Sequence, residues 1–131
     1  MSYFTDSRYV TEIDDDEFED TNITHIKNNQ LTAVLFYADW CPHCKNFKDT
    51  YESFARKALF MNVTAFNCAL NKKWVLCAKE RHENFVKTYP TIFFYYKGKP
   101  VKKFSKERTV KNLIDEAMLI CTSTNESCEV R

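Results

Sequence analysis

Two cysteines separated by two residues are the clearest candidates for chemistry in this chain. They are Cys41 and Cys44, in the run Trp40-Cys41-Pro42-His43-Cys44. Two intervening residues at the start of a helix place both sulfur atoms on one side of the first turn, close enough to form a small disulfide. The pair therefore predicts reversible thiol chemistry.

The residues on either side predict that the pair lies between a strand and a helix. The nearly continuous apolar run Thr32 to Ala38 is typical of a strand covered on both faces. An apolar stripe follows at helical spacing, at Phe47, Tyr51, Phe54, Ala58 and Leu59. This stripe predicts a long amphipathic helix beginning near Pro42, because proline suits the first helical position.

A helix beginning at this point gives the two thiols different roles. Unpaired backbone N–H groups and the helix dipole stabilise a thiolate at a helix N-terminus. We therefore expect Cys41 to be the exposed, attacking thiol. Cys44 shares the helical stripe of Phe47 and Tyr51, so we expect it to be the buried, resolving thiol.

The rest of the chain predicts alternating strands and helices. Further strands are expected at Tyr9 to Ile13, Met61 to Phe66, Thr91 to Tyr96 and Val101 to Phe104. Gly98 should take a positive-φ position in the turn between the last two strands. Helices are expected from the acidic cluster at Asp14 to about Asn28, through Trp74, Cys77 and Ala78 to about Phe85, and over Val110 to Cys121. This order predicts an α/β sheet with helices on both faces.

Composition excludes several classes of protein. The chain has 131 residues, 44% hydrophobic and 28% charged, with a formal net charge of +1, which suits one ordinary globular domain. Acidic residues gather between Asp14 and Asp20, and lysines gather between Lys97 and Lys106. We interpret both clusters as solvated faces, and the near-neutral total argues against nucleic-acid binding.

The N-terminal sequence and the apolar runs bear on location. The first twenty residues are polar and acidic, and the longest apolar run, Ala33 to Ala38, is far too short to cross a membrane. We therefore expect a cytoplasmic protein without membrane attachment. Scarce glycine with abundant Asn, Lys and Phe also suits an A+T-rich genome, so we add the hypothesis of a viral protein packaged in a virion.

Two segments carry a resemblance to a known family. Val34 to Phe47 is similar to the strand, tryptophan, CxHC pair and helix of the thioredoxin superfamily, and Val86 to Ile92 is similar to the segment that carries its cis-proline. The closest resemblance is to the catalytic domains of protein disulfide isomerases, over about Tyr9 to Ile120. It implies a thioredoxin fold with a central mixed sheet in a single domain, residues 1–124, followed by a polar tail, residues 125–131.

The resemblance also implies roles for residues outside the cysteine pair. It implies a cis bond before Pro90 that faces the active site, with the backbone of Thr88 and Tyr89 pairing with an extended substrate peptide. Arg108 matches an arginine thought to lower the pKa of the resolving cysteine, and a simple loop arginine is the alternative. His43 resembles the histidine of strongly oxidising members, which favours an oxidising or isomerising role.

One position departs from the family pattern. Leu35 stands six residues before Cys41, where the family places a buried carboxylate that moves protons for the resolving cysteine. Without that acid, deprotonation of Cys44 must depend on water, Arg108 or a substitute. Asp39 is a candidate substitute, although we expect it at the exposed rim.

The remaining cysteines allow more than one interpretation. Cys68 and Cys77 resemble a structural disulfide of some disulfide-isomerase domains, with two free core thiols as the alternative. We expect Cys121 to be packed on the apolar face of the last helix, and Cys128 has no assigned role. A zinc site would need Cys41, Cys44 and two more ligands among Cys68, Cys77, His43 and His82, which the helix-opening pair argues against.

Two functional hypotheses follow. The first is a monomeric thiol-disulfide oxidoreductase that needs no cofactor or metal, acts on protein thiols and disulfides, and exchanges electrons with a redox partner. The second is a peptide-binding module or chaperone in which the redox chemistry is vestigial, and Leu35 is its best support.

Overall fold

The computed structural model describes residues 2–19, 22–70, 77, 86–124 and 127–128. In these residues a five-stranded mixed sheet has the strand order β1-β5-β4-β6-β7. Its strands are β1 (Thr11–Glu12), β4 (Thr32–Tyr37), β5 (Asn62–Asn67), β6 (Thr91–Tyr96) and β7 (Lys99–Lys103). The strands β1, β5 and β4 run parallel, and β6 and β7 are antiparallel to their neighbours. This is the predicted thioredoxin fold.

The central strand β4 positions the candidate site. All six of its residues are buried, as its continuous apolar sequence predicts for a strand covered on both faces. Leu35 lies opposite Ala65 of β5 on one side and Ile92 of β6 on the other. The parallel strands β4 and β5 therefore end at the same edge of the sheet, and Cys41 follows β4 at this edge.

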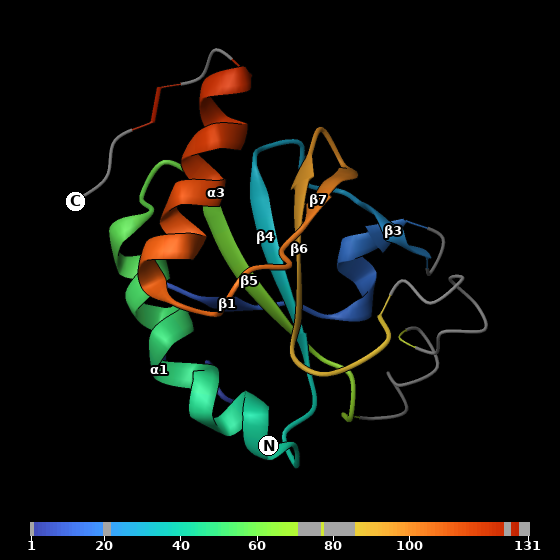
Figure 1. Cartoon of the computed structure of the whole chain (residues 1–131). Helices are drawn as coiled ribbons and strands as arrows, with labels where there is room; N and C mark the ends of the chain where they lie inside the picture. The colour runs from blue at the N-terminus through green and yellow to red at the C-terminus, as the bar shows by residue number, and fades with distance from the viewer. Residues whose placement is uncertain (1, 20–21, 71–76, 78–85, 125–126, 129–131) are drawn as a thin grey trace.

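Two long helices, α1 (Pro42–Lys57) and α3 (Val110–Ser123), lie side by side on one face of the sheet (Figure 1). Helix α1 begins at Pro42, as predicted. Helix α3 is capped by Thr109, whose Oγ1 accepts a hydrogen bond from the backbone N–H of Asn112 at 3.1 Å. The core beneath them contains Leu35, Phe54, Ile92, Phe94 and Leu113.

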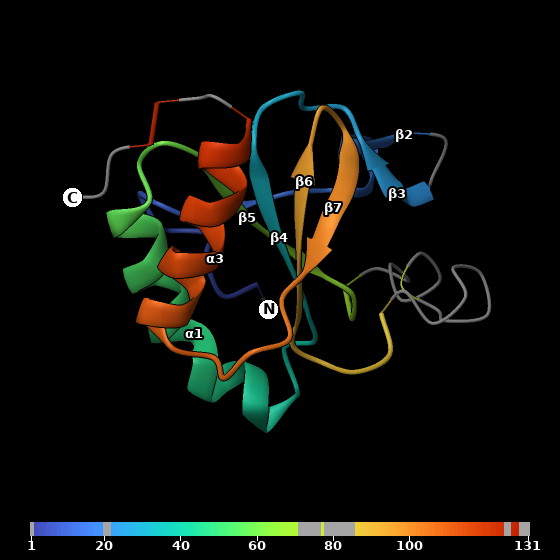
Figure 2. The ribbon, with the colours of Figure 1, turned by 45° about the horizontal axis from the view of Figure 1, so that its top comes forward.

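The opposite face shows where the sequence-based prediction was wrong. The helix expected from Asp14 to about Asn28 is instead a short 3-10 helix, η1 (Asp15–Glu17), followed by the antiparallel pair β2 (Phe18–Glu19) and β3 (Asn22–Ile26). Figure 2 shows this pair on the far side of the sheet from α1 and α3. Buried Phe18, Ile23 and Ile26 pack there, so contact with the sheet decides the structure of this segment.

Other predicted elements differ in smaller ways or lie outside the described residues. The first strand is limited to two residues of Tyr9 to Ile13, and β5 ends one residue beyond the expected Phe66. The β6–β7 turn has Gly98 at φ +84°, as predicted, and Lys97 also has a positive φ. The helix expected from Trp74 to Phe85 falls on residues that the structure does not describe, apart from Cys77. None of the described helices is long and apolar enough to span a membrane.

Candidate active site

Cys41 is the N-cap residue of α1, with an extended backbone at φ −82° and ψ 122°. Its N–H donates to the carbonyl of Ala38 at 3.0 Å, and its own carbonyl accepts from the N–H of Lys45 at 3.1 Å. The turn after β4 thus leads directly into the first turn of α1. Cys41 and Cys44 are both free thiols in this structure, and together they form a dithiol at the helix N-terminus.

The two thiols are less different in exposure than expected. Cys44 is 2% exposed, as its place on the helical stripe predicts, but Cys41 is only 7% exposed rather than open to solvent. The Cys41 Sγ lies 3.6 Å from the carbonyl oxygen of Tyr89 and donates to it. The segment that contains Tyr89 therefore lies against the sulfur of Cys41. The sequence next to Cys41 does not reveal this contact.

Burial determines the ionisation of Cys44. It raises the pKa of the Cys44 thiol to about 12, and a hydrogen bond with Cys41 and the charge of Cys41 act in the same direction. A backbone hydrogen bond at Ala38 and the positive charge of Arg108 act against this rise. At neutral pH the Cys44 thiol is therefore protonated, and it must lose this proton before it can attack another sulfur.

Arg108, His43 and Trp40 surround the dithiol. The Arg108 guanidinium lies over the ring of Phe47, 6.0 Å from the ring centre, and is close enough to Cys44 to affect its pKa. His43 is exposed and lines the same hollow as Phe47 and Arg108. Trp40 is 64% exposed and meets the ring of Tyr89 edge to face, with ring centres 6.2 Å apart.

The segment before β6 forms the other wall of the site. The Tyr89–Pro90 peptide bond is cis. The Oγ1 of Thr91 donates to the carbonyl of Thr88 at 2.6 Å, which holds this turn together. Thr88, Pro90 and Arg108 line a second hollow. The structure thus brings together the dithiol, Arg108 and the segment from Thr88 to Pro90.

Leu35 is an apolar residue of the core, 2% exposed. A carboxylate on the same face of the sheet belongs to Glu12 of β1, two strands away across Ala65. Glu12 Oε2 accepts a hydrogen bond from the Tyr37 hydroxyl at 2.5 Å. Burial raises the pKa of Tyr37, and Glu12 raises it further.

Tyr3 is a neighbour of the dithiol that sequence reasoning missed. Its hydroxyl donates to the carbonyl of Asp39 at 2.8 Å, and its ring stacks on Tyr37 with centres 4.7 Å apart. Burial raises the pKa of Tyr3 to about 12, and the charges of Cys44, Asp39 and Cys41 act in the same direction. Tyr3 precedes the first predicted strand, and no motif in the sequence marks it.

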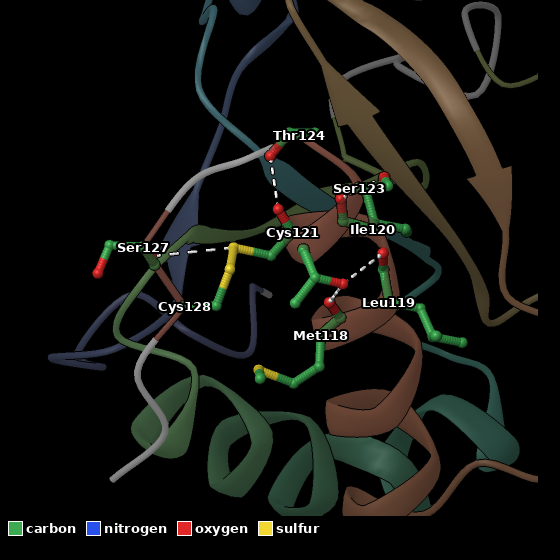
Figure 3. Close-up of a disulfide and its surroundings, with 9 residues drawn as sticks. Met118, Leu119, Ile120, Cys121, Ser123, Thr124, Ser127 and Cys128 are labelled. Atoms are coloured by element: carbon green, nitrogen blue, oxygen red, sulfur yellow. Dashed lines mark hydrogen bonds between the residues drawn. A yellow bond between two sulfur atoms is a disulfide. The ribbon is translucent and has the colours of Figure 1, made fainter.

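The other four cysteines form two disulfides. Cys68 is joined to Cys77, with Cα atoms 6.0 Å apart. Cys121 is joined to Cys128, with Cα atoms 6.1 Å apart, so Cys121 is not simply a packed thiol as expected (Figure 3). Thr124 closes α3 beside this bond, where its hydroxyl donates to the carbonyl of Cys121 at 2.7 Å.

These bonds leave little basis for the zinc alternative. Cys68 and Cys77 are bonded to each other, and a metal ligand must be a free thiolate. In the part of the chain that the structure describes, no group of three or more His, Cys, Asp and Glu residues could hold a metal ion. The fourth candidate ligand, His82, lies outside the described residues.

The sequence of this chain is similar to those of several protein disulfide isomerases. The chain is 38% identical over 98 residues to protein disulfide-isomerase A5 of Mus musculus, which covers 72% of this chain and 17% of the mouse protein. It is 30% identical over 112 residues to protein disulfide-isomerase 1 of Caenorhabditis elegans, covering 84% of this chain and 21% of the relative. The chain thus spans about a fifth of the length of these relatives.

Solved structures and the family match agree with the fold. The J-Trx1 fragment of ERdj5 superposes with a TM-score of 0.71 at 24% identity, covering 92% of this chain and 55% of that fragment. Residues 9–118 match the thioredoxin family, a span that includes the dithiol, the Thr88–Pro90 segment and Arg108. By its sequence, its fold and its relatives, this chain belongs to the thioredoxin family.

Proposed function

We propose that this protein is a thiol-disulfide oxidoreductase that exchanges disulfides with protein substrates through Cys41 and Cys44. The observation that carries the proposal is the pair of free thiols at the N-terminus of α1, with Cys41 as its N-cap residue. A thiolate formed there is stabilised by unpaired N–H groups and the helix dipole. The protein disulfide isomerases among the relatives support the same class of reaction.

The proposed reaction passes through a mixed disulfide. In the reducing direction, the Cys41 thiolate attacks a substrate disulfide, forms a bond to one substrate sulfur and releases the other as a thiolate. Cys44 then loses its proton and attacks the Cys41 sulfur, which closes the Cys41–Cys44 disulfide and releases the second substrate thiol. Two electrons pass from the protein to the substrate, and oxidation of a substrate dithiol follows the same steps in reverse.

We infer an oxidising or isomerising role from the residues beside the dithiol. His43 follows Pro42 on the first turn of α1, and Arg108 lines the same hollow as His43. Positive charge at this position stabilises the reduced, thiolate form of the pair, and a more stable reduced form makes the disulfide a stronger oxidant. The segment from Thr88 to Pro90 would hold an extended substrate against Cys41, since the Tyr89 carbonyl already contacts its sulfur.

The deciding experiment is a redox titration of the pair in graded glutathione buffers, read by alkylation and mass. A potential well above that of a reducing thioredoxin, about −270 mV, would support the oxidising or isomerising role. A strongly negative potential would make the protein a reductase. The Cys44→Ala variant should accumulate mixed disulfides with substrates, and a reactive Cys41 without such adducts would contradict the mechanism.

A second candidate function is peptide binding with little redox activity. Two observations favour it: Leu35 places an apolar side chain where the family has an acid, and burial raises the pKa of Cys44 to about 12. Both would slow the resolving step. Turnover of a small dithiol with a peptide disulfide distinguishes the candidates, because a peptide-binding module would bind the peptide without changing its oxidation state.

A further inference from the structure

Two hollows flank the dithiol, and both have positively charged walls. The first is lined by His43, Asn46, Phe47, Thr50, Lys106, Glu107 and Arg108. The second lies along the segment before β6, and its lining includes Thr88 and Pro90 together with Lys103, Lys106 and Arg108. Lys106 and Arg108 line both hollows. We call Lys103, Lys106 and Arg108 the cationic rim.

The rim is held in place by the chain that connects β7 to α3. The N–H of Phe104 donates to the carbonyl of Ile92 at 2.9 Å, which ties this connection to β6. The carbonyl of Glu107 accepts from the N–H of Thr109 at 2.9 Å and from Asn112 Nδ2 at 3.0 Å. The backbone that carries Lys106 and Arg108 is therefore fixed relative to the Thr88–Pro90 segment.

The charges of the rim are not neutralised within the described structure. Among the described residues, none of the three cations forms a salt bridge with a carboxylate. Of the described residues that line the two hollows, Glu107 is the only acidic one, so the hollows have three positive charges and one negative charge among these side chains. All three cations are exposed and therefore accessible to a bound segment.

We propose that the cationic rim selects client segments that carry acidic residues beside the reacting cysteine. This inference rests on the proposed function, because a client segment that lies along Thr88 and Pro90 passes the rim. A carboxylate on such a segment would meet unpaired positive charge, whereas a lysine or arginine would be repelled. Charge complementarity of this kind mainly raises the rate of association and discriminates among partners.

Two peptides of equal length, each with an internal disulfide, test the proposal. Asp flanks the cysteines in one peptide, and Lys flanks them in the other. The reduced protein is mixed with each peptide, and the oxidised protein is quantified by mass after acid quenching. Each rate is divided by the rate of the same peptide with free dithiothreitol, which corrects for the intrinsic reactivity of the two disulfides.

We expect the corrected rate to be roughly fivefold to tenfold higher for the acidic peptide at low ionic strength, with a smaller ratio in about 0.5 M salt. The double variant Lys103→Gln/Lys106→Gln should bring the ratio close to 1. The matched control Lys57→Gln/Lys99→Gln removes two exposed lysines at the far end of α1 and at the start of β7, and it should keep the wild-type ratio.

The outcomes separate this inference from the proposed function. Three results would overturn the proposed role of the cationic rim and leave the oxidoreductase function standing. They are equal corrected rates, a preference for the basic peptide, and an acidic preference that persists in the Lys103→Gln/Lys106→Gln variant. Failure of the wild-type protein to react with either peptide would overturn both. The salt dependence of the wild-type protein tests the electrostatic origin without any substitution.

Discussion

The proposed chemistry depends on the ionisation of one buried thiol, Cys44. Cys41 has the helix N-terminus and the Tyr89 carbonyl for neighbours, whereas Cys44 lies in the core, where burial raises its pKa and the positive charge of Arg108 acts against this rise. Resolution by Cys44 therefore depends on pH and on the charge of Arg108. In the proposed cycle, Cys44 must lose its proton before it can attack the mixed disulfide.

The raised pKa of Cys44 makes stability depend on pH. This pKa moves from its ordinary value of 9.0 to about 12 on folding, so between these values the unfolded chain has lost a proton that the folded protein keeps. The contribution of Cys44 to stability is complete below pH 9 and declines as pH rises toward 12. The Cys41→Ser variant, in which Cys44 cannot form the active-site disulfide, should therefore lose stability in alkaline buffer.

This decline can be measured by urea unfolding of Cys41→Ser at about pH 7 and about pH 10. The double variant Cys41→Ser/Cys44→Ser is the matched control, because it retains every tyrosine with a raised pKa but lacks the buried thiol. It should lose less free energy of unfolding between the two pH values. An equal loss in both variants would show that Cys44 ionises no differently in the folded and unfolded states.

Arg108 should affect the resolving step through its charge. Replacing it with glutamine removes the positive charge that lowers the Cys44 pKa, so we expect Arg108→Gln to slow release of a mixed disulfide roughly threefold at neutral pH, a modest effect because the guanidinium is exposed. The pH profile of release should move to higher pH. Arg108→Lys should restore most of the rate, and an unshifted profile in Arg108→Gln would contradict this role.

At the scale of secondary structure, the N-terminal region shows what local patterns miss. The acidic cluster after Ile13 satisfies the rules for a helix start, yet among the described residues of this segment only Asp15–Glu17 is helical. The residues that follow pair as β2 and β3 because Phe18, Ile23 and Ile26 pack against the sheet. That contact is long-range, so sequence periodicity could not reveal it.

Gly98 joins this N-terminal pair to the β6–β7 turn. The N–H of Ile26 donates to the Gly98 carbonyl at 2.9 Å, and a Cβ at position 98 would lie 2.8 Å from the carbonyl oxygen of Ile26. We expect Gly98→Ala to lower the free energy of unfolding by roughly 1–3 kcal/mol, because φ is +84° and the backbone must shift. Urea unfolding measures this loss. Lys99→Ala, at the next exposed position, should stay within about 0.5 kcal/mol of the wild type.

At the scale of the whole molecule, the parts that could be predicted are those with local signals. The apolar β4 sequence, the stripe of α1 and the glycine turn each have a characteristic pattern, and the family resemblance ordered them into a sheet. The N-terminal hairpin, the contact of Tyr3 with Asp39 and the Cys121–Cys128 bond have no such pattern. Each depends on segments that meet only after the chain has folded.

The Cys121–Cys128 disulfide joins the C-terminal segment to α3 and should add to global stability. It restricts the unfolded chain by closing a short loop, so we expect Cys128→Ala to lower the free energy of unfolding by about 2 kcal/mol. Urea unfolding under non-reducing conditions provides the measurement. The proposed redox activity should be unchanged, because the bond lies at the opposite end of α3 from Arg108. An unchanged unfolding midpoint would indicate that the bond does not constrain the unfolded chain.

The burial of Phe4 has a practical consequence for where the protein can be cut. Phe4 is 1% exposed and packs against Tyr37 and Tyr51, with ring centres 6.1 and 5.8 Å away, although the family match begins only at residue 9. A recombinant fragment trimmed to that boundary would have a cavity in place of the Phe4 ring, and its free energy of unfolding would be lower by something on the order of 3–5 kcal/mol. It would also lose the Tyr3 hydroxyl that holds Asp39. Expression boundaries for this protein should therefore lie upstream of Tyr3.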